Sequence, residues 1–154
     1  MTRKRVNRKV WSTNIDTITH AITGEAITDS VALNKVRMLE LSAIDAFVNG
    51  RASLQDWRAV VDMLNVCEMM AKSGIGPEAI PHCEQATQSL HKAAMRYEKT
   101  KKMGLDGLGL TAIKEVHEYH DLQRTSIARS EYEKMIKKTA DYIKSKGKEV
   151  TVIT

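Results

Sequence analysis

Hydrophobic residues recur at intervals of three and four along most of the chain, and this spacing is typical of amphipathic α-helices. The clearest stripe consists of Leu54, Trp57, Val60, Val61, Leu64, Cys67 and Ala71. Ser53 precedes this stripe, and its hydroxyl oxygen can accept the unpaired amide hydrogens of a first helical turn. Gly74 follows the stripe and ends the pattern. The sequence therefore predicts a helix that begins at Ser53 and ends just before Gly74.

The same spacing predicts five further helices, over residues 12–23, 29–48, 76–102, 111–127 and from 130 onward. Pro77 suits a first helical turn, although Pro81 can delay the true start of that helix. Ser130 and Glu133 have the spacing of a capping box. Whether the last two helices are separate, or form one kinked helix, is left open by the pattern.

Two segments do not fit a helical pattern. Residues 104–110 are rich in glycine, but they follow no strand and lack the lysine–serine pair of a phosphate-binding loop. We therefore predict a flexible connection there. Residues 150–154 favour an extended conformation and could add to the edge of another element.

Length and composition agree with a helical fold. A chain of 154 residues allows one domain, and its 42% hydrophobic and 28% charged residues exclude wholesale disorder. Only two prolines interrupt it. We predict an all-α fold, a single-domain bundle of about five to six helices. The predicted boundaries are a basic N-terminal arm over 1–11, a helical domain over 12–148 and a short extended C-terminal tail over 149–154.

The net charge of +5 is unevenly distributed. The first nine residues contain five basic side chains and no acidic one, namely Arg3, Lys4, Arg5, Arg8 and Lys9. A second basic group opposes only Glu98, and it consists of Lys92, Arg96, Lys99, Lys101 and Lys102. Six further lysines lie within 130–148, whereas residues 10–91 contain ten acidic and five basic side chains. We predict that the two named groups contact phosphate or an acidic partner; the alternative is a solvated tail that aids solubility.

The densest polar segment runs from Glu115 to Asp121. On a helix, His117 and His120 share a face, as two metal ligands or an acid–base pair would. Two ligands do not complete a metal site, however. Because Ile113, Val116 and both histidines fall on one stripe, we expect them to lie at the border of the core and to hydrogen-bond to a neighbouring helix.

The absence of common catalytic motifs argues against an enzyme. The chain contains no nucleophile elbow, zinc-protease motif, Walker sequence or Cys-x-x-Cys pair. Cys67 and Cys83 are too few for a disulfide scaffold, and we expect both to be reduced and packed in the core. No segment reads as a signal peptide or as a membrane span. We therefore expect a cytoplasmic protein that is not an enzyme and uses no cofactor.

The chain resembles short helical accessory proteins of proteobacterial phages and plasmids. The resemblance rests on a basic N-terminus, on the segment 39–65 and on residues 118–123 (Glu-Tyr-His-Asp-Leu-Gln). It implies a mobile-element protein, a class that includes inhibitors of host defence such as anti-CRISPR proteins. The expected partner is then a host protein or ribonucleoprotein complex in a bacterial cytoplasm, bound through surface contact. Two alternative functions stay open: a nonspecific nucleic-acid-binding or regulatory protein of the element and, third, a metal-dependent enzyme that uses His117 and His120. A homo-oligomer is a further possible partner.

Overall fold

The computed structural model describes residues 9–11, 29–146 and 150–152. These residues form a helical bundle with a two-stranded ribbon, which confirms the predicted all-α class. The α-helices are α2 (Asp29–Val48), α3 (Leu54–Lys72), α4 (Ile80–Thr100), α5 (Gly107–Thr125) and α6 (Arg129–Lys146). The predicted helix over 12–23 lies outside the described residues.

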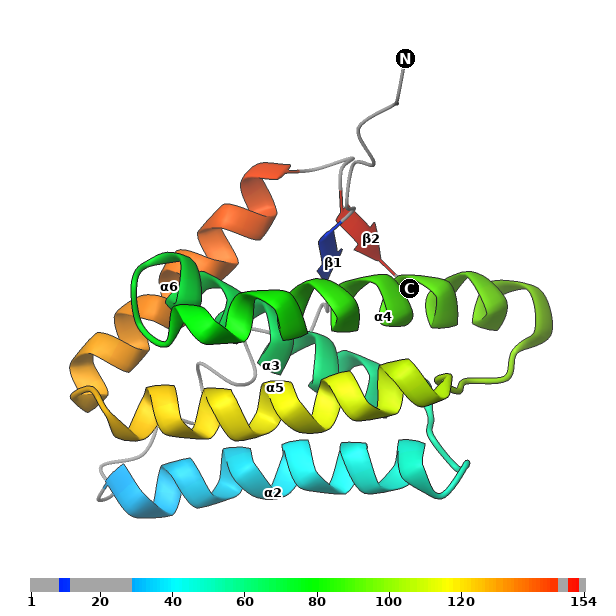
Figure 1. Ribbon diagram of the computed structural model, residues 1–154, viewed down its shortest axis with the longest axis horizontal. Helices are drawn as coiled ribbons and strands as arrows, with labels where there is room; N and C mark the ends of the chain where they lie inside the picture. Colours follow the sequence, from blue (N-terminus) through cyan, green and yellow to red (C-terminus); the bar gives the residue numbers. More distant parts are fainter. Residues whose placement is uncertain (1–8, 12–28, 147–149, 153–154) are drawn as a thin grey trace.

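Helix α3 is the centre of the bundle. It packs against α2, α4, α5 and α6; α4 and α5 run side by side in front of it, and α2 runs below α5 (Figure 1). Twelve of its nineteen residues are buried, Trp57 among them, and the indole N–H of Trp57 donates to the carbonyl oxygen of Leu90 at 3.0 Å. A second buried cluster joins α2, α3 and α6 around Met70 and Ile136. The stripe that the sequence shows most clearly is therefore the one that the other helices cover.

The start of α3 has the predicted cap. Ser53 accepts a hydrogen bond from the amide of Asp56 at 3.3 Å, and the Asp56 carboxylate accepts from the amide of Ser53 at 2.7 Å. The two residues form a capping box, which satisfies amide groups that the first helical turn leaves unpaired.

We expect Ser53→Ala to lower the free energy of unfolding by about 1 kcal/mol, since it removes one half of this reciprocal cap. Urea unfolding followed by circular dichroism measures the change. Ser130→Ala is the control, because Ser130 is exposed within α6 and its loss should change stability by less than about 0.5 kcal/mol. An equal effect of both substitutions would contradict the cap's contribution.

Pro77 and Pro81 act in succession at the next helix. A 3₁₀ turn, η1 (Pro77–Ala79), comes first, and α4 begins at Ile80 with Pro81 in its first turn. Gly76 precedes the turn with a φ of 65°, a conformation that glycine adopts without strain. The start of the α-helix is thus delayed, as the second proline suggested.

The prediction of a flexible connection over 104–110 is wrong for its second half. Helix α5 begins at Gly107, because Asp106 caps it by accepting from the amide of Gly109 at 2.7 Å. Gly109 is buried, and a Cβ built there would lie 2.8 Å from that of Ser89 on α4. The glycine therefore permits α5 and α4 to approach closely.

Helices α5 and α6 are separate. Residues 126–128 are not helical and connect the two helices. Helix α6 begins at Arg129, one residue before the predicted cap at Ser130. Ser130 therefore lies inside the helix. The ion pair between Arg129 and Glu133, 3.0 Å from Nε to Oε1, spans the first turn.

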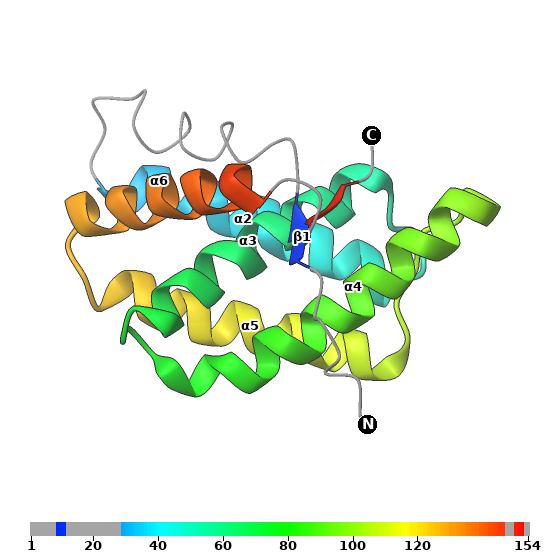
Figure 2. The same ribbon diagram turned by 90° about the horizontal axis from the view of Figure 1, so that it is seen from above.

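The ends of the described chain meet in a short ribbon. Strand β1 (Lys9–Trp11) pairs in parallel with β2 (Val150–Val152), with Lys9 opposite Val150. The ribbon lies between α4 and the C-terminal end of α6 (Figure 2), and β1 contacts α3 and α4. The β-favouring end of the chain thus pairs with the last residues of the basic segment.

Candidate functional site

The second predicted basic group lies at the C-terminal end of α4 and in the loop after it. Its five side chains belong to exposed residues, and the last turns of α4 extend past the ends of α2 and α5 (Figures 1 and 2). Lys92, Arg96 and Lys99 are spaced along the helix face opposite the buried stripe. We call this group, Lys92, Arg96, Lys99, Lys101 and Lys102, the α4 basic end.

Intramolecular contacts engage the side chains of only some members of this group. Arg96 donates to the carbonyl oxygen of Gly104 at 2.8 Å, and the ammonium of Lys101 lies 5.4 Å from the ring centre of Tyr97. Within the described residues, Lys92, Lys99 and Lys102 form no ion pair. Cations at the end of a helix also complement its dipole, but this contribution leaves their ammonium groups at the surface.

The N-terminal group cannot be placed in the same way. Arg3, Lys4, Arg5 and Arg8 lie outside the described residues. Lys9 is the first residue of β1, so the backbone of the basic segment reaches the bundle at that point.

A hollow of about 620 Å³ lies between α3 and α6. Lysines are the most frequent residues around it, and acidic, polar and large side chains complete the lining: Asn65, Glu68, Met69, Lys72, Lys134, Lys137, Lys138, Thr139, Asp141 and Tyr142. Six lysines of the segment 130–148 were visible in the sequence, but the contribution of α3 was not. We call this region the α3–α6 hollow.

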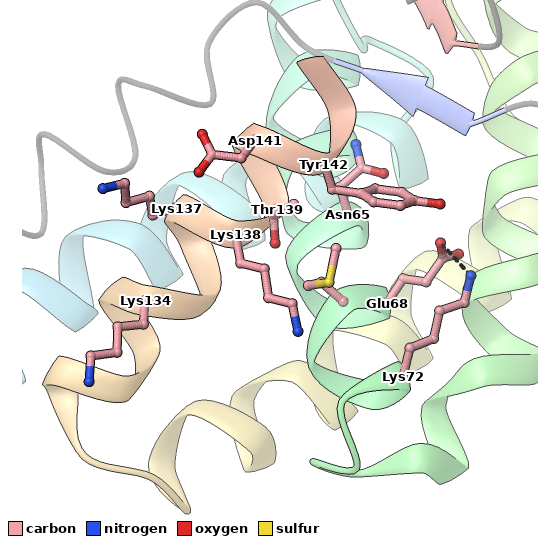
Figure 3. A pocket seen from close by; sticks show the side chains of 10 residues that line it. Asn65, Glu68, Lys72, Lys134, Lys137, Lys138, Thr139, Asp141 and Tyr142 are labelled. Carbon is pink, nitrogen blue, oxygen red and sulfur yellow. Dashed lines mark hydrogen bonds and ion pairs between the residues drawn. The ribbon is translucent and has the colours of Figure 1, made fainter. Parts of the chain in front are cut away.

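The lysines of the hollow differ in direction. Lys138 and Tyr142 extend from α6 toward α3, whereas Lys134 and Lys137 point away from it (Figure 3). Lys138 donates to the hydroxyl of Ser73 at 3.2 Å, and Lys72 pairs with Glu68 at 3.3 Å. The result is a depression with positive charge on its rim and an aromatic ring beside it.

His117 and His120 belong to a buried polar network, as the core-border interpretation predicts. The carbonyl oxygen of the Gln123 side chain accepts from Nδ1 of His120 at 3.0 Å, and the hydroxyl of Tyr132 lies 3.2 Å from Nε2. The Gln123 amide donates to the backbone oxygens of Cys67 and Ile75. These partners assign the proton of a neutral His120 to Nδ1. His120 thereby ties α5 to α6.

The same network contains an ion pair that the sequence analysis missed. Arg124 of α5 donates two hydrogen bonds to Glu40 of α2, at 2.7 and 2.8 Å, and their side chains are 0% and 3% exposed. Nε2 of His117 lies 3.5 Å from the Glu40 carboxylate. The available signal was Glu40 itself, a charged residue within the apolar stripe of Val36, Ala43 and Phe47.

Burial and the ion pair shift the protonation of this network. Burial, together with the nearby Arg124 guanidinium, lowers the pKa of His120 to about 4. Burial opposes the charge of Arg124, but the hydrogen bonds to Glu40 and the negative charge of Glu40 together outweigh burial and raise the arginine pKa. His120 is thus neutral and Arg124 charged at pH 7. This enclosed cluster holds α2, α5 and α6 together, and Nε2 of His117 is the one atom described above that has no hydrogen-bond partner in it.

Cys67 and Cys83 are both free and buried, with their sulfur atoms 3.6 Å apart between α3 and α4. The hydrogen bond with Cys83 raises the pKa of Cys67, and burial raises it further. The Cys67 thiol therefore lacks the thiolate character of a reactive cysteine.

The described residues contain neither a metal-binding cluster nor a helix able to span a membrane. No group of three or more His, Cys, Asp or Glu side chains is arranged to hold a metal ion in this part of the chain. Among the same residues, no helix has the length and apolar character required to cross a membrane.

Comparison with known proteins adds no relative. The sequence matches no protein-family model, and neither the curated proteins nor the solved structures contain a significant match to it.

Proposed function

We propose that this chain is a non-enzymatic binding protein that occupies an acidic or phosphate-bearing surface of a larger complex. The observation that carries the proposal is the α4 basic end, whose five exposed cations face a single acid, Glu98, within 92–102. Positive charge on a projecting element attracts anionic surfaces and accelerates encounter with them.

The backbone at the end of α4 supports a role beyond folding. Lys101 has a φ of 57°, in the left-handed region, and its amide donates to the carbonyl oxygen of Tyr97 at 2.8 Å. Glycine is the usual residue at such a position because a side chain there costs about 1 kcal/mol or more. A lysine at this position adds a cation to the basic end at the expense of stability, a pattern associated with functional sites.

The chemistry of the α3–α6 hollow is consistent with the same class of partner. Its rim carries four lysines against two acids, Glu68 and Asp141. The resemblance to phage and plasmid accessory proteins supports a more specific proposal. The chain would then be a mobile-element protein that inhibits or modulates a host complex, and an anti-CRISPR activity is one example. Nonspecific binding to nucleic acid is the alternative function, and the test must distinguish it from binding to a host complex.

We expect Lys92→Gln/Lys99→Gln to lower the affinity for the partner roughly tenfold, because two exposed charge contacts together contribute about 1.4 kcal/mol. The full-length chain is immobilised and exposed to lysate of a bacterial host. The captured complex is identified by mass spectrometry, and its affinity for each variant is measured after purification. Arg51→Gln/Lys114→Gln is the control, since it removes the same charge from exposed positions elsewhere and should bind as the parent does.

The same variants on a labelled DNA duplex separate the two functions. If the protein is a nonspecific nucleic-acid binder, duplex affinity falls steeply with salt and no protein complex is retained after nuclease treatment. Equal capture by the test variant and its control would contradict the role of the α4 basic end.

A further inference from the structure

The solvent-facing side of α2 carries a regular stripe of its own. Its positions are separated by three, four, three, four and three residues, and the residues are Val31, Asn34, Met38, Leu41, Asp45 and Val48. All six are exposed; Met38 is 67% and Leu41 48% accessible. This is the alternation of the a and d positions of a coiled coil. We call these six residues the outer stripe.

The outer stripe is separate from the core face of α2. Val36, Glu40, Ala43 and Phe47 point into the bundle and pack or pair there, whereas the outer stripe lies on the opposite side. Helix α2 forms one edge of the bundle (Figure 1). A helix with apolar residues on both faces is expected to be covered on both, and exposed Met38 and Leu41 form the centre of an apolar patch that favours a partner.

The order of residues identifies that partner as a second copy. The stripe has the same order of apolar and polar residues in both directions. A valine stands at each end, a polar residue comes next, and methionine and leucine lie at the centre. We propose that two chains associate through α2 in an antiparallel, two-fold symmetric pair. Val31 then meets Val48 of the partner subunit, and Met38 meets the partner's Leu41. Antiparallel pairing and self-complementary faces are what a two-fold dimer requires.

The polar positions specify the direction of pairing. The same register brings Asn34 opposite Asp45 of the partner subunit, where an amide N–H can donate to a carboxylate. The oxygen of the Asn34 side chain already accepts from Arg37 at 3.3 Å, which leaves its amide group for such a contact. A parallel pair would instead set Asp45, whose carboxylate also pairs with Arg51 of its own chain, against the partner's Asp45, which has no donor to offer. One polar pair within an apolar seam is a known determinant of register.

The size of the stripe sets the expected strength. Positions 31–48 span about 26 Å of helix, and one such helix pair buries less than the roughly 1,000 Å² of a strong interface. We therefore expect a weak dimer, with a Kd on the order of 1–100 μM. This association is independent of the proposed function, because the outer stripe shares no residue with the α4 basic end.

The test is sedimentation equilibrium of the full-length chain between about 1 and 300 μM. The parent should change from monomer to dimer across this range, and Met38→Glu should remain monomeric with at least a tenfold weaker Kd. Leu122→Glu is the matched control: Leu122 of α5 is 68% exposed and lies off the stripe, so the same substitution there should leave the dimer intact. A parent that stays monomeric, or equal weakening by both variants, overturns the proposal.

Cysteine cross-linking tests the direction. In the presence of oxidised glutathione, Val31→Cys/Val48→Cys should form a covalent dimer, whereas neither single variant should. Positions 31 and 48 of one chain are too far apart to join to each other, and the native cysteines are buried. Efficient cross-linking of Val31→Cys alone would indicate a parallel pair and overturn the antiparallel register.

Discussion

Arg124→Met is expected to lower the free energy of unfolding by about 3–5 kcal/mol, because it leaves the Glu40 carboxylate buried without its main partner. Arg124 supplies two hydrogen bonds to Glu40, and it also donates from Nε to Asp121 at 3.0 Å. Water cannot replace these contacts, since both side chains of the pair are enclosed. Urea unfolding monitored by circular dichroism at pH 7 provides the measurement.

Two further variants make the result specific to an unpaired buried charge. Glu40→Leu/Arg124→Met removes both charges and should recover much of the lost stability, since apolar replacements of buried pairs are often neutral or stabilising. Arg51→Met removes an exposed ion pair with Asp45 and should cost less than about 1 kcal/mol. If the double variant is no more stable than Arg124→Met, the loss has a different origin, such as packing.

Acidification from pH 6.5 to 4 is expected to remove about 3 kcal/mol of stability through His120 alone. Burial lowers the pKa of His120 from 6.5 to about 4 in the folded protein. Below pH 6.5 the unfolded chain therefore takes up a proton at this residue, whereas the folded chain does so only near pH 4. Stability falls across this interval by about 1.4 kcal/mol per unit of pKa difference.

His120→Asn should flatten the dependence of unfolding free energy on pH between 6.5 and 4, although it also lowers stability at pH 7. The control is His82→Asn, because His82 is half-buried beside Glu115 and its loss should leave the His120 dependence in place. A parent protein whose stability is constant over this interval would show that His120 titrates normally.

Asp121 affects stability in a lower pH interval than His120 and therefore does not obscure the effect of His120. Burial raises its pKa, but the hydrogen bonds and the positive charges of Arg37 and Arg124 together outweigh burial and hold the pKa below its usual value of 3.8. The folded chain therefore loses the stabilising effect of Asp121 only as pH falls below 3.8.

Local signals predicted the helices well because they act within one turn of the chain. The stripe from Leu54 to Ala71, its cap at Ser53 and the pair of prolines at the start of α4 were all legible in the sequence, and the structure contains each of them. The start of α5 was predicted four residues too late. Its glycines suggested flexibility, whereas Gly109 is buried because α4 packs against it.

The candidate site was predictable only in part. Charge counting identified the α4 basic end, and the structure places all five of its residues at exposed positions. The α3–α6 hollow could not be anticipated, since its lining comes from two helices, and the lining residues of one helix are more than sixty positions from those of the other. The histidines were expected to hydrogen-bond at the border of the core, but their partners Gln123 and Tyr132 were not identifiable from spacing.

The amino-acid sequence determined the helix positions, their caps and the distribution of charge, because backbone hydrogen bonding and side-chain periodicity depend on near neighbours. It did not determine which helices meet. Glu40 and Arg124 are 84 positions apart, and β1 pairs with β2 across nearly the whole chain. Such contacts depend on how complete helices pack against one another, and only the folded chain brings their residues together.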